Sequence, residues 1–234
     1  MKKKCIWNWD KKKELFTGLN NLTIVTPSDW MAGLVRQSFL NSFRIEVINN
    51  GINLNEFKPT YGYVQRKYGI SNKKIVLGVS SSWVKSKGLD DFSQLAYKLP
   101  SQYQIVLVGL KKEQKNALPE NIIGIKRTDN VHELAELYTA AEVFVNPTYE
   151  DNYPTTNLEA LACGTPVITY KTGGSVEAVE ASGCGVIVDQ GDINELAKAV
   201  LSIDYNQEEK HCLYSCDENS NYEKYLELYK DLLK

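Results

Sequence analysis

The chain has 234 residues, of which 43% are hydrophobic and 24% are charged, and its formal net charge is −2. These values are ordinary for a globular protein and exclude a disordered tail, a collagen-like rod and a coiled coil. Proteins that bind nucleic acids usually carry a basic excess, so no nucleic-acid partner is expected. No stretch approaches the roughly 20 apolar residues that span a bilayer.

The five cysteines are an odd number and are scattered along the chain. Together with the expected lack of a secretory signal, this usage fits a reducing cytoplasm. Cys212 and Cys216 beside His211 lack a second pair of metal ligands, so no metal site is expected. The lysine runs at 2–4 and 11–13 are either solvated ends or contacts to an anionic membrane surface. We therefore expect a cytoplasmic protein, free or peripheral at the inner face of the membrane.

The first 45 residues contain one predicted strand, 22–25, and one predicted helix, 29–40, with Ser28 as its N-cap. One strand–helix unit is too small to form a core of its own. We expect residues 1–45 to be the partial remnant of an N-terminal domain. A further strand, 44–48, is predicted before the turn at Asn49-Asn50-Gly51.

Between residues 74 and 189, short β-branched apolar runs alternate with amphipathic helical patterns. Such runs are typical of strands that are buried on both faces of a parallel sheet. The predicted strands are 75–79, 105–108, 121–125, 143–146, 167–170 and 185–188. This alternation predicts an α/β fold with a doubly wound parallel sheet over residues 46–205. Residues 206–234 are predicted to be a polar segment followed by a helix at 222–233.

Basic, glycine and hydroxyl residues gather in the loops that follow the predicted strands. Ligands of an open parallel sheet bind beyond the carboxyl ends of its strands. The loops at this edge are 80–88, 109–112, 126–130, 147–156 and 171–175. Cations neutralise phosphate charge, and glycines let backbone N–H groups approach phosphate oxygens. The sequence therefore predicts a phosphate-containing ligand at this edge.

The loop that contains Asp151 is the most informative, because a helix is predicted to start near Thr156 and stop at Gly164. The N–H groups of its first turn can bind an anion, and Asp151 and Glu159 can accept hydrogen bonds from sugar hydroxyls. Purely structural roles for these acids stay open as well. Thr156 and Glu159 also fit a capping box, and Glu150 and Asp151 can be ordinary loop acids. A glycosidase-type pair of carboxylates would explain none of the basic loops.

Several segments resemble one known family. VFVNPTYEDNYPTTNLEALACGTPVITYKTGGSVEAV resembles the donor-binding signature of the group 1 glycosyltransferases, also called glycosyltransferase family 4. VINNGINLNEFKP is similar to that family's inter-domain linker. IVLGVSSSWVKSKGLDDF and YQIVLVGL are similar to the first two strands and loops of its C-terminal domain. The likeness extends from about residue 22 to about residue 202, and the combination and order of the motifs are specific to the family.

The resemblance implies a GT-B fold, in which two Rossmann-like domains hold a nucleotide-sugar between them. It implies that Glu159 contacts the ribose, that Asp151 or Glu150 contacts the transferred sugar, and that Lys87 binds the phosphates. The family's usual arginine falls near Ser82, which leaves Lys85 as the implied helper of Lys87. Backbone groups at the sugar and pyrophosphate, and side chains beside the nucleobase, complete the implied site: Tyr153, Pro154, Thr155, Thr156, Asn157, Lys126 and Arg127.

The expected function is that of the donor-binding half of a retaining, hexosyltransferase-type glycosyltransferase in the synthesis of surface polysaccharides or glycoconjugates. The implied donor is a UDP-sugar or GDP-sugar, without a metal, and the implied acceptor is a saccharide or lipid-linked. The family's N-terminal domain binds the acceptor and often supplies a histidine, so the resemblance implies that residues 1–45 are a remnant of this acceptor-binding domain. These residues lack a histidine, and we expect this chain alone not to be fully active. The alternatives are a binding module that works with a separate acceptor-domain partner chain and an epimerase-like enzyme of GT-B fold. Exposed apolar surface further predicts self-association.

Overall fold

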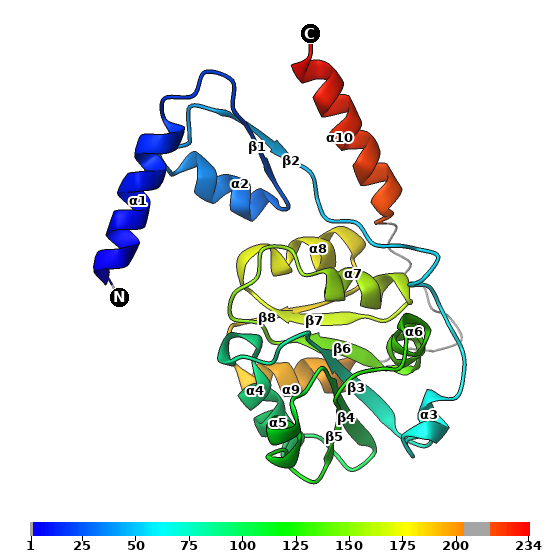
Figure 1. Ribbon diagram of the computed structural model, residues 1–234. Helices are drawn as coiled ribbons and strands as arrows, with labels where there is room; N and C mark the ends of the chain where they lie inside the picture. The colour runs from blue at the N-terminus through cyan, green and yellow to red at the C-terminus, as the bar shows by residue number, and fades with distance from the viewer. Residues whose placement is uncertain (1, 204–215) are drawn as a thin grey trace. The chain divides into compact units, whose positions relative to one another are not determined.

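The computed structural model describes residues 2–203 and 216–234, apart from the side chains of residues 2–4 (Figure 1). The chain divides after Asn49 into two compact units, Met1–Asn49 and Asn50–Lys234. Each unit is described by itself.

The first unit is a small two-stranded sheet with two helices. Its elements are α1 (Lys2–Phe16), β1 (Thr23–Thr26), α2 (Asp29–Arg36) and β2 (Arg44–Val47). β1 and β2 pair in parallel. The Ser28 side chain accepts a hydrogen bond from the N–H of Met31 and caps α2, as the sequence predicts.

Two features of the first unit differ from the sequence prediction. α2 ends at Arg36 instead of residue 40, because the N–H groups of Gln37 and Ser38 turn back to carbonyls only three residues earlier and tighten the last turn. α1 is not predicted at all. Its large apolar side chains, among them Trp7 and Leu15, are mostly exposed, so no buried face gives the sequence a helical period.

The second unit is built on a sheet of six parallel strands in the order β5-β4-β3-β6-β7-β8. The strands are β3 (Lys74–Val79), β4 (Tyr103–Val108), β5 (Ile122–Ile125), β6 (Val143–Asn146), β7 (Val167–Tyr170) and β8 (Gly185–Val188). Every predicted strand is confirmed to within two residues at each end. All residues of β6 and β7 are buried, which explains their continuous apolar runs.

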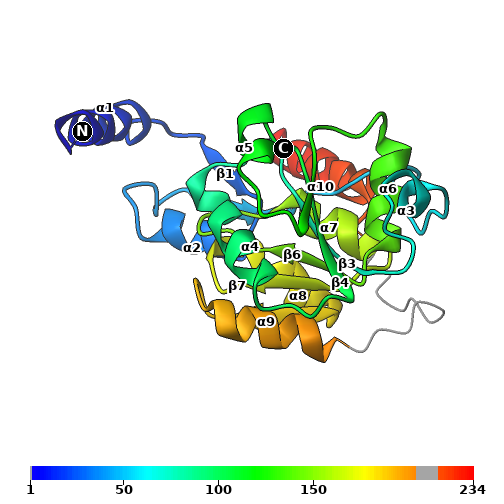
Figure 2. The same cartoon turned by 90° about the horizontal axis from the view of Figure 1, so that it is seen from below.

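Helices cover both faces of this sheet (Figures 1 and 2). Alternate residues of each strand point to opposite faces, so Ile75 and Leu77 belong to one apolar cluster and Val76 to the other. The first cluster packs against α6 (Val131–Ala140), α7 (Thr155–Ala162) and α8 (Glu177–Ser182), and the second against α4 (Leu89–Ala96) and α9 (Ile193–Ser202). The sheet is therefore doubly wound, as predicted.

Shorter elements and one late helix complete the unit: α3 (Val64–Lys67), η1 (Lys85–Lys87), α5 (Lys112–Asn116), η2 (Gly173–Ser175) and α10 (Glu218–Leu232). α10 confirms the helix predicted at 222–233, although it begins earlier, with the Asp217 side chain as its cap. The N–H of Ile52 donates to the carbonyl of Cys216, and the N–H of Glu218 donates to the carbonyl of Ile52. These bonds fasten the start of the second unit to the start of α10.

The strand order places a topological switch point between β3 and β6. From β3 the chain moves outward to β4 and β5, and from β6 it moves outward the other way to β7 and β8. The loops that leave these two central strands therefore diverge and open a crevice at the carboxyl edge. In the described part of the chain, no helix has both the length and the apolar character needed to cross a membrane.

Candidate functional site

A cavity of about 280 Å³ lies at the carboxyl edge of the sheet, between the ends of β3 and β6. Its position is the switch point at which doubly wound sheets bind their ligands. Its walls come from the end of β3 and the following loop, the end of β6 with its loop, and the start of α7. The lining residues are Val79, Ser80, Ser81, Trp83, Lys87, Val145, Asn146, Asp151, Tyr153, Pro154, Thr155 and Thr156.

An ion pair forms part of this lining. Lys87 Nζ lies 2.6 Å from Asp151 Oδ2, and the two side chains are 31% and 18% exposed. Lys87 ends η1, whereas Asp151 lies in the loop after β6. The two loops are also joined through their backbones, because the N–H of Tyr149 donates to the carbonyl of Ser86 at 2.7 Å. A cation and an acid are thus held together on one wall of the cavity.

The N-terminus of α7 forms another part of the lining. Pro154 occupies the N-cap position and makes no side-chain hydrogen bond to the helix, and Thr155 and Thr156 line the cavity. The start of a helix carries a partial positive charge on its unpaired N–H groups. α7 therefore presents to the cavity an end that favours an anion.

The capping box proposed for Thr156 and Glu159 is wrong. α7 begins one residue earlier than predicted, so Thr156 is inside the helix and Pro154 takes the cap position. The Glu159 carboxylate instead accepts a hydrogen bond from the hydroxyl of Tyr138, at 2.8 Å to Oε2. Burial raises the pKa of Glu159, while hydrogen bonds from Tyr138 and Thr155 act in the opposite direction.

Four buried polar side chains form a network beneath the cavity. Asn146 donates to Asn157 Oδ1 at 2.8 Å, and Asn157 donates to the carbonyl of Ser175 at 3.0 Å. The hydroxyls of Ser175 and Thr169 lie 2.6 Å apart, and Thr169 donates to the carbonyl of Asn146. Buried polar groups need such partners, and this closed network joins β6, β7 and α7 with η2. The side chain of Asn157 therefore supports the site from below.

Gly173 brings the loop after β7 against the loop that carries Asp151. Its φ of +51° lies in the left-handed region, and a Cβ atom there would overlap the carbonyl oxygen of Asp151. The N–H of Gly174 donates to that same carbonyl at 3.2 Å. Glycine is thus required at this position for the backbone of Asp151 to be held in place.

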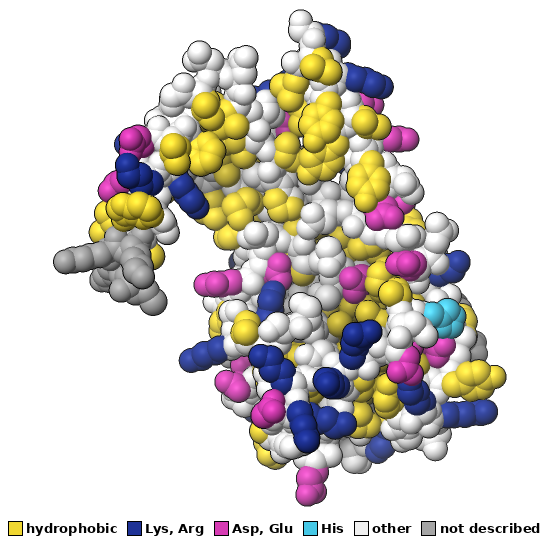
Figure 3. Space-filling view, in the orientation of Figure 1, with side chains coloured by type: hydrophobic (Ala, Val, Ile, Leu, Met, Phe, Trp, Pro, Cys, Tyr) yellow, Lys and Arg dark blue, Asp and Glu magenta, His cyan; other side chains and the backbone are white. Residues whose placement is uncertain are grey.

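Six of the expected site residues line the cavity, and the others lie elsewhere. Lining it are Lys87, Asp151, Tyr153, Pro154, Thr155 and Thr156. Asn157 and Glu159 lie further along α7 and do not line it. Glu150 and Lys85 are exposed and do not belong to its lining. Lys126 and Arg127 are exposed after β5, which is separated from β3 by β4. On the face seen in Figure 3, basic side chains gather over α4 and α5.

Besides the aliphatic Val79 and Val145, four lining side chains are absent from the sequence-based set: Ser80, Ser81, Trp83 and Asn146. The first three lie in the loop that the sequence already places at the carboxyl edge. The indole N–H of Trp83 donates to the carbonyl of Val108 at 2.8 Å, so the ring is fixed against β4. The missing information was the strand order, because only the loops of β3 and β6 border the cavity.

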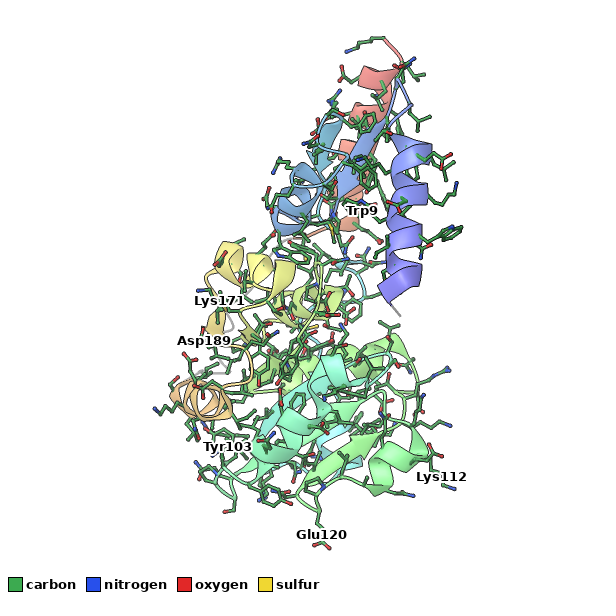
Figure 4. The ribbon with its side chains drawn as sticks, turned by 90° about the vertical axis from the view of Figure 1, so that its left-hand side faces the viewer. Trp9, Tyr103, Lys112, Glu120, Lys171 and Asp189 are labelled. Atoms are coloured by element: carbon green, nitrogen blue, oxygen red, sulfur yellow. The ribbon has the colours of Figure 1, made fainter. Side chains whose placement is uncertain are left out.

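The opposite edge of the sheet holds a second cavity of about 370 Å³, near Tyr103 and Gln104. Figure 4 labels Tyr103 at the start of β4 and Lys112 beyond its end, on opposite sides of the unit. Three polar side chains in this second cavity, those of Lys73, Gln104 and Asn121, donate to backbone carbonyls. Within residues 2–203 and 216–234, no cluster of three or more His, Cys, Asp or Glu side chains is arranged to hold a metal ion. His211 and Cys212 lie outside the described residues.

Comparison with known proteins gives a consistent result. A family model described as "Glycosyl transferases group 1" matches residues 64–215. A Campylobacter jejuni protein named N,N'-diacetylbacillosaminyl-diphospho-undecaprenol alpha-1,3-N-acetylgalactosaminyltransferase is 27% identical over 227 residues, which cover 87% of this chain. The match spans only 58% of that relative's length.

Many solved structures share the fold, and two of them serve as examples. The Anabaena protein HepE in complex with UDP superposes with a TM-score of 0.80 at 19% identity, over 96% of this chain and 67% of that one. A glycosyltransferase from Rickettsia africae superposes with a TM-score of 0.79 at 22% identity, over 95% of this chain and 67% of that one. These likenesses and the doubly wound sheet show the α/β architecture of the GT-B fold.

Proposed function

This chain belongs to the group 1 glycosyltransferases, and on that premise we propose that the cavity at its carboxyl edge binds a nucleoside diphosphate sugar for retaining glycosyl transfer. One observation carries the proposal: a lysine, an acid and the open start of a helix line the same cavity at the switch point. A diphosphate needs cations and N–H donors, and a sugar needs hydrogen-bond acceptors.

Each group has a role in the proposed reaction. As the bond between sugar and diphosphate breaks, negative charge builds on the leaving diphosphate, and Lys87 with the start of α7 stabilises that charge. The sugar passes through an oxocarbenium-like transition state. Asp151 accepts a hydrogen bond from a sugar hydroxyl, and it is a better candidate than Glu150 because it lines the cavity. Glu159 accepts from the ribose.

Three basic residues outside the cavity lining, Lys85, Lys126 and Arg127, have weaker support as donor-binding residues. Lys85 belongs to the same short helix as Lys87 and is proposed to attract the phosphates from the loop. Lys126 and Arg127 are proposed to lie at the nucleobase end of the bound donor. Because β4 lies between β5 and β3, these two residues are separated from the cavity along the sheet edge. We therefore expect them to attract the incoming nucleotide more than to bind it tightly.

Calorimetric titration of this chain with UDP, GDP and their hexose derivatives tests the proposal. We expect dissociation constants from micromolar to millimolar, an order-of-magnitude range. Lys87→Ala should weaken diphosphate binding roughly 10- to 100-fold, as expected for loss of a charged hydrogen bond, and leave nucleoside binding unchanged. Lys112→Ala, an exposed lysine outside the cavity lining, is the matched control. Failure of every nucleotide in the panel to bind would contradict the proposal.

Full transfer is proposed to need an acceptor-binding part in addition to residues 1–234. The name of the Campylobacter relative gives a diphospho-undecaprenol acceptor, and we propose a lipid-linked or saccharide acceptor in surface polysaccharide synthesis. The relatives named above are glycosyltransferases, which favours transfer over epimerisation. Transfer of a labelled sugar to a lipid-linked acceptor, with and without a co-expressed acceptor domain, measures this. Conversion of a UDP-hexose to its epimer would favour the epimerase instead.

We also propose that the protein acts at the cytoplasmic face of a membrane. α1 contains six lysines and two acids within fifteen residues, and clustered lysines are attracted to anionic lipid headgroups. Sedimentation with vesicles that contain anionic lipid, and with neutral vesicles as the control, tests this. Equal binding to both would remove the electrostatic basis of the proposal.

A further inference from the structure

Two fully buried tyrosines in the second unit each donate a hydrogen bond to a carboxylate. Tyr138 on α6 donates to Glu159 on α7 at 2.8 Å, and Tyr170 on β7 donates to Asp91 on α4 at 2.9 Å. Both tyrosines are fully buried, with 0% exposure. The pairs lie on opposite faces of the sheet, because Tyr138 belongs to one apolar cluster and Tyr170 to the other. Only the first pair includes a residue that the proposed function uses.

Packing fixes the hydroxyl of Tyr138 in place. Its ring meets Phe57 and Phe144 edge to face, with centroids 6.2 and 5.4 Å apart. The Thr165 side chain donates a hydrogen bond to the backbone carbonyl of Tyr138. A ring held on several sides cannot follow a moving carboxylate, so the hydroxyl is a fixed point toward which Glu159 must orient.

The bond also favours the form of Glu159 that can accept hydrogen bonds. Burial raises the pKa of this carboxyl, and the hydrogen bond from Tyr138 is the largest of the opposing influences. A neutral carboxylic acid has one oxygen occupied by a proton and accepts less well. Without the tyrosine hydroxyl, the same burial would leave Glu159 less ionised and free to change its rotamer.

We infer that Tyr138 is a positioning residue, which aims the Glu159 carboxylate and keeps it an acceptor for the ribose hydroxyls of the nucleotide. The inference rests on the proposed function, since it gives Glu159 its ligand. The geometry supplies the rest: a rigid donor on α6, a half-buried carboxylate on α7 and a hydrogen bond of ordinary length between them.

The test compares Tyr138→Phe with Tyr170→Phe, each of which removes one buried hydroxyl and keeps the ring. Calorimetry measures the affinity for UDP and for its 2′,3′-dideoxy analogue, which lacks both ribose hydroxyls. We expect Tyr138→Phe to weaken UDP binding about tenfold and to leave the affinity for the analogue nearly unchanged. The preference for UDP over the analogue, which is the ratio of the two affinities, should therefore be largely lost. Tyr170→Phe should lower thermal stability and keep the wild-type ratio.

A pH series gives a second readout that a merely structural role would not move. Because the variant loses the bond that favours ionised Glu159, its UDP affinity should begin to fall at a higher pH on acidification than that of the wild type. A Tyr138→Phe protein with the wild-type ratio and pH profile would overturn the inference. If wild type binds no nucleotide, the proposed function fails instead, so the two failures are distinct.

Should Tyr138→Phe not fold, 3,5-difluorotyrosine at position 138 retains the ring and makes its hydroxyl a stronger donor. The loss of UDP affinity on acidification should then begin at a lower pH than in the wild type, because a stronger donor favours the ionised carboxylate. An unchanged profile with this substitution would also overturn the inference.

Discussion

On each face of the six-stranded sheet a carboxylate is withdrawn from water and hydrogen-bonded to a tyrosine, but the two carboxylates differ in what else they can contact. Each face buries a tyrosine whose hydroxyl donates to a carboxylate, Tyr138 to Glu159 and Tyr170 to Asp91. In both pairs, burial raises the pKa of the carboxyl. Asp91 is only 5% exposed and also bonds to Tyr149, so it is enclosed within the protein. Glu159 is half-buried and lies on α7, the helix whose N-terminus lines the cavity.

The difference shows how one interaction serves either folding or binding, according to what else the carboxylate can reach. Asp91 has tyrosine partners on the inside and lines neither of the cavities described above, so its pair is expected to contribute to stability alone. Glu159 lies on α7, whose first residues line the candidate site. The following predictions test whether the two pairs can be separated by experiment.

The largest expected effect is the loss of protein stability when the carboxylate of Asp91, on the face of the sheet covered by α4, is removed. Asp91→Ala leaves the buried hydroxyl of Tyr170 without its acceptor, and an unpaired buried polar group costs about 1–3 kcal/mol. Urea denaturation should show a free energy of unfolding lower by that amount. UDP affinity, measured on the folded variant, should stay within about twofold of wild type. A large loss of affinity at unchanged stability would show that the two faces are not separable in this way.

Glu159→Gln should have the opposite profile. The amide keeps the shape of the side chain but lacks the charge that strengthens hydrogen bonds, so UDP affinity is expected to fall roughly tenfold, or about 1.4 kcal/mol. Stability should change less than in Asp91→Ala. Asp91→Asn is the matched control, since it makes the same chemical change on the other face. Unchanged UDP binding in Glu159→Gln, together with a clear loss of stability, would assign this pair to folding as well.

The pH dependence of stability gives a smaller effect. The pKa of Asp91 is higher in the folded state than in the unfolded chain, so the folded state binds more protons between the two values. The free energy of unfolding should therefore rise as the pH falls from neutrality toward the ordinary aspartate value of about 4. Thermal unfolding of wild type and Asp91→Asn over this range isolates the contribution, because the variant cannot titrate there. Identical slopes in the two proteins would contradict it.

The smallest expected effect concerns the second hydrogen bond to Glu159. Thr155 contributes a hydrogen bond that lowers the pKa of this carboxyl, and it is exposed at the start of α7. Thr155→Val removes the bond and keeps the shape, so we expect roughly a threefold loss of UDP affinity. Thr155→Ser retains the hydroxyl and should restore most of it. If both variants bind UDP alike, the hydroxyl has no such role.

Periodicity was sufficient to predict the sheet because its strands are buried on both faces. The run Val167–Tyr170 is apolar or small throughout, and all four residues are buried. The same reasoning missed α1, where Trp7 and Leu15 are exposed and leave no pattern. The predicted helix at 29–40 is also too long. The tight last turn of α2 at Gln37 depends on backbone hydrogen bonds, which the spacing of side chains does not reveal.

The sequence predicts that the site lies at the carboxyl edge of the sheet, but it does not predict which loops along that edge form it. Lys87 and Asp151 are 64 positions apart in the sequence, yet they meet because their strands are neighbours. Lys126 follows a strand that pairs elsewhere in the sheet. Likewise, the local pattern at Thr156 and Glu159 fits a capping box, but a long-range bond from Tyr138 determines where the carboxylate points. Local sequence carries no information about either contact.

The short pairing between β3 and β6 has a consequence for the local unfolding of the second unit. These strands are paired at Val76 with Val143 and at Leu77 with Phe144, whereas β3 and β4 pair along all of Lys74–Val79. Fewer ladder bonds hold the two halves of the sheet to each other than hold the strands within each half. Hydrogen exchange should therefore resolve β5-β4-β3 and β6-β7-β8 as two cooperative units. The cavity takes its walls from both, so a ligand that bridges them would slow the exchange of the whole sheet.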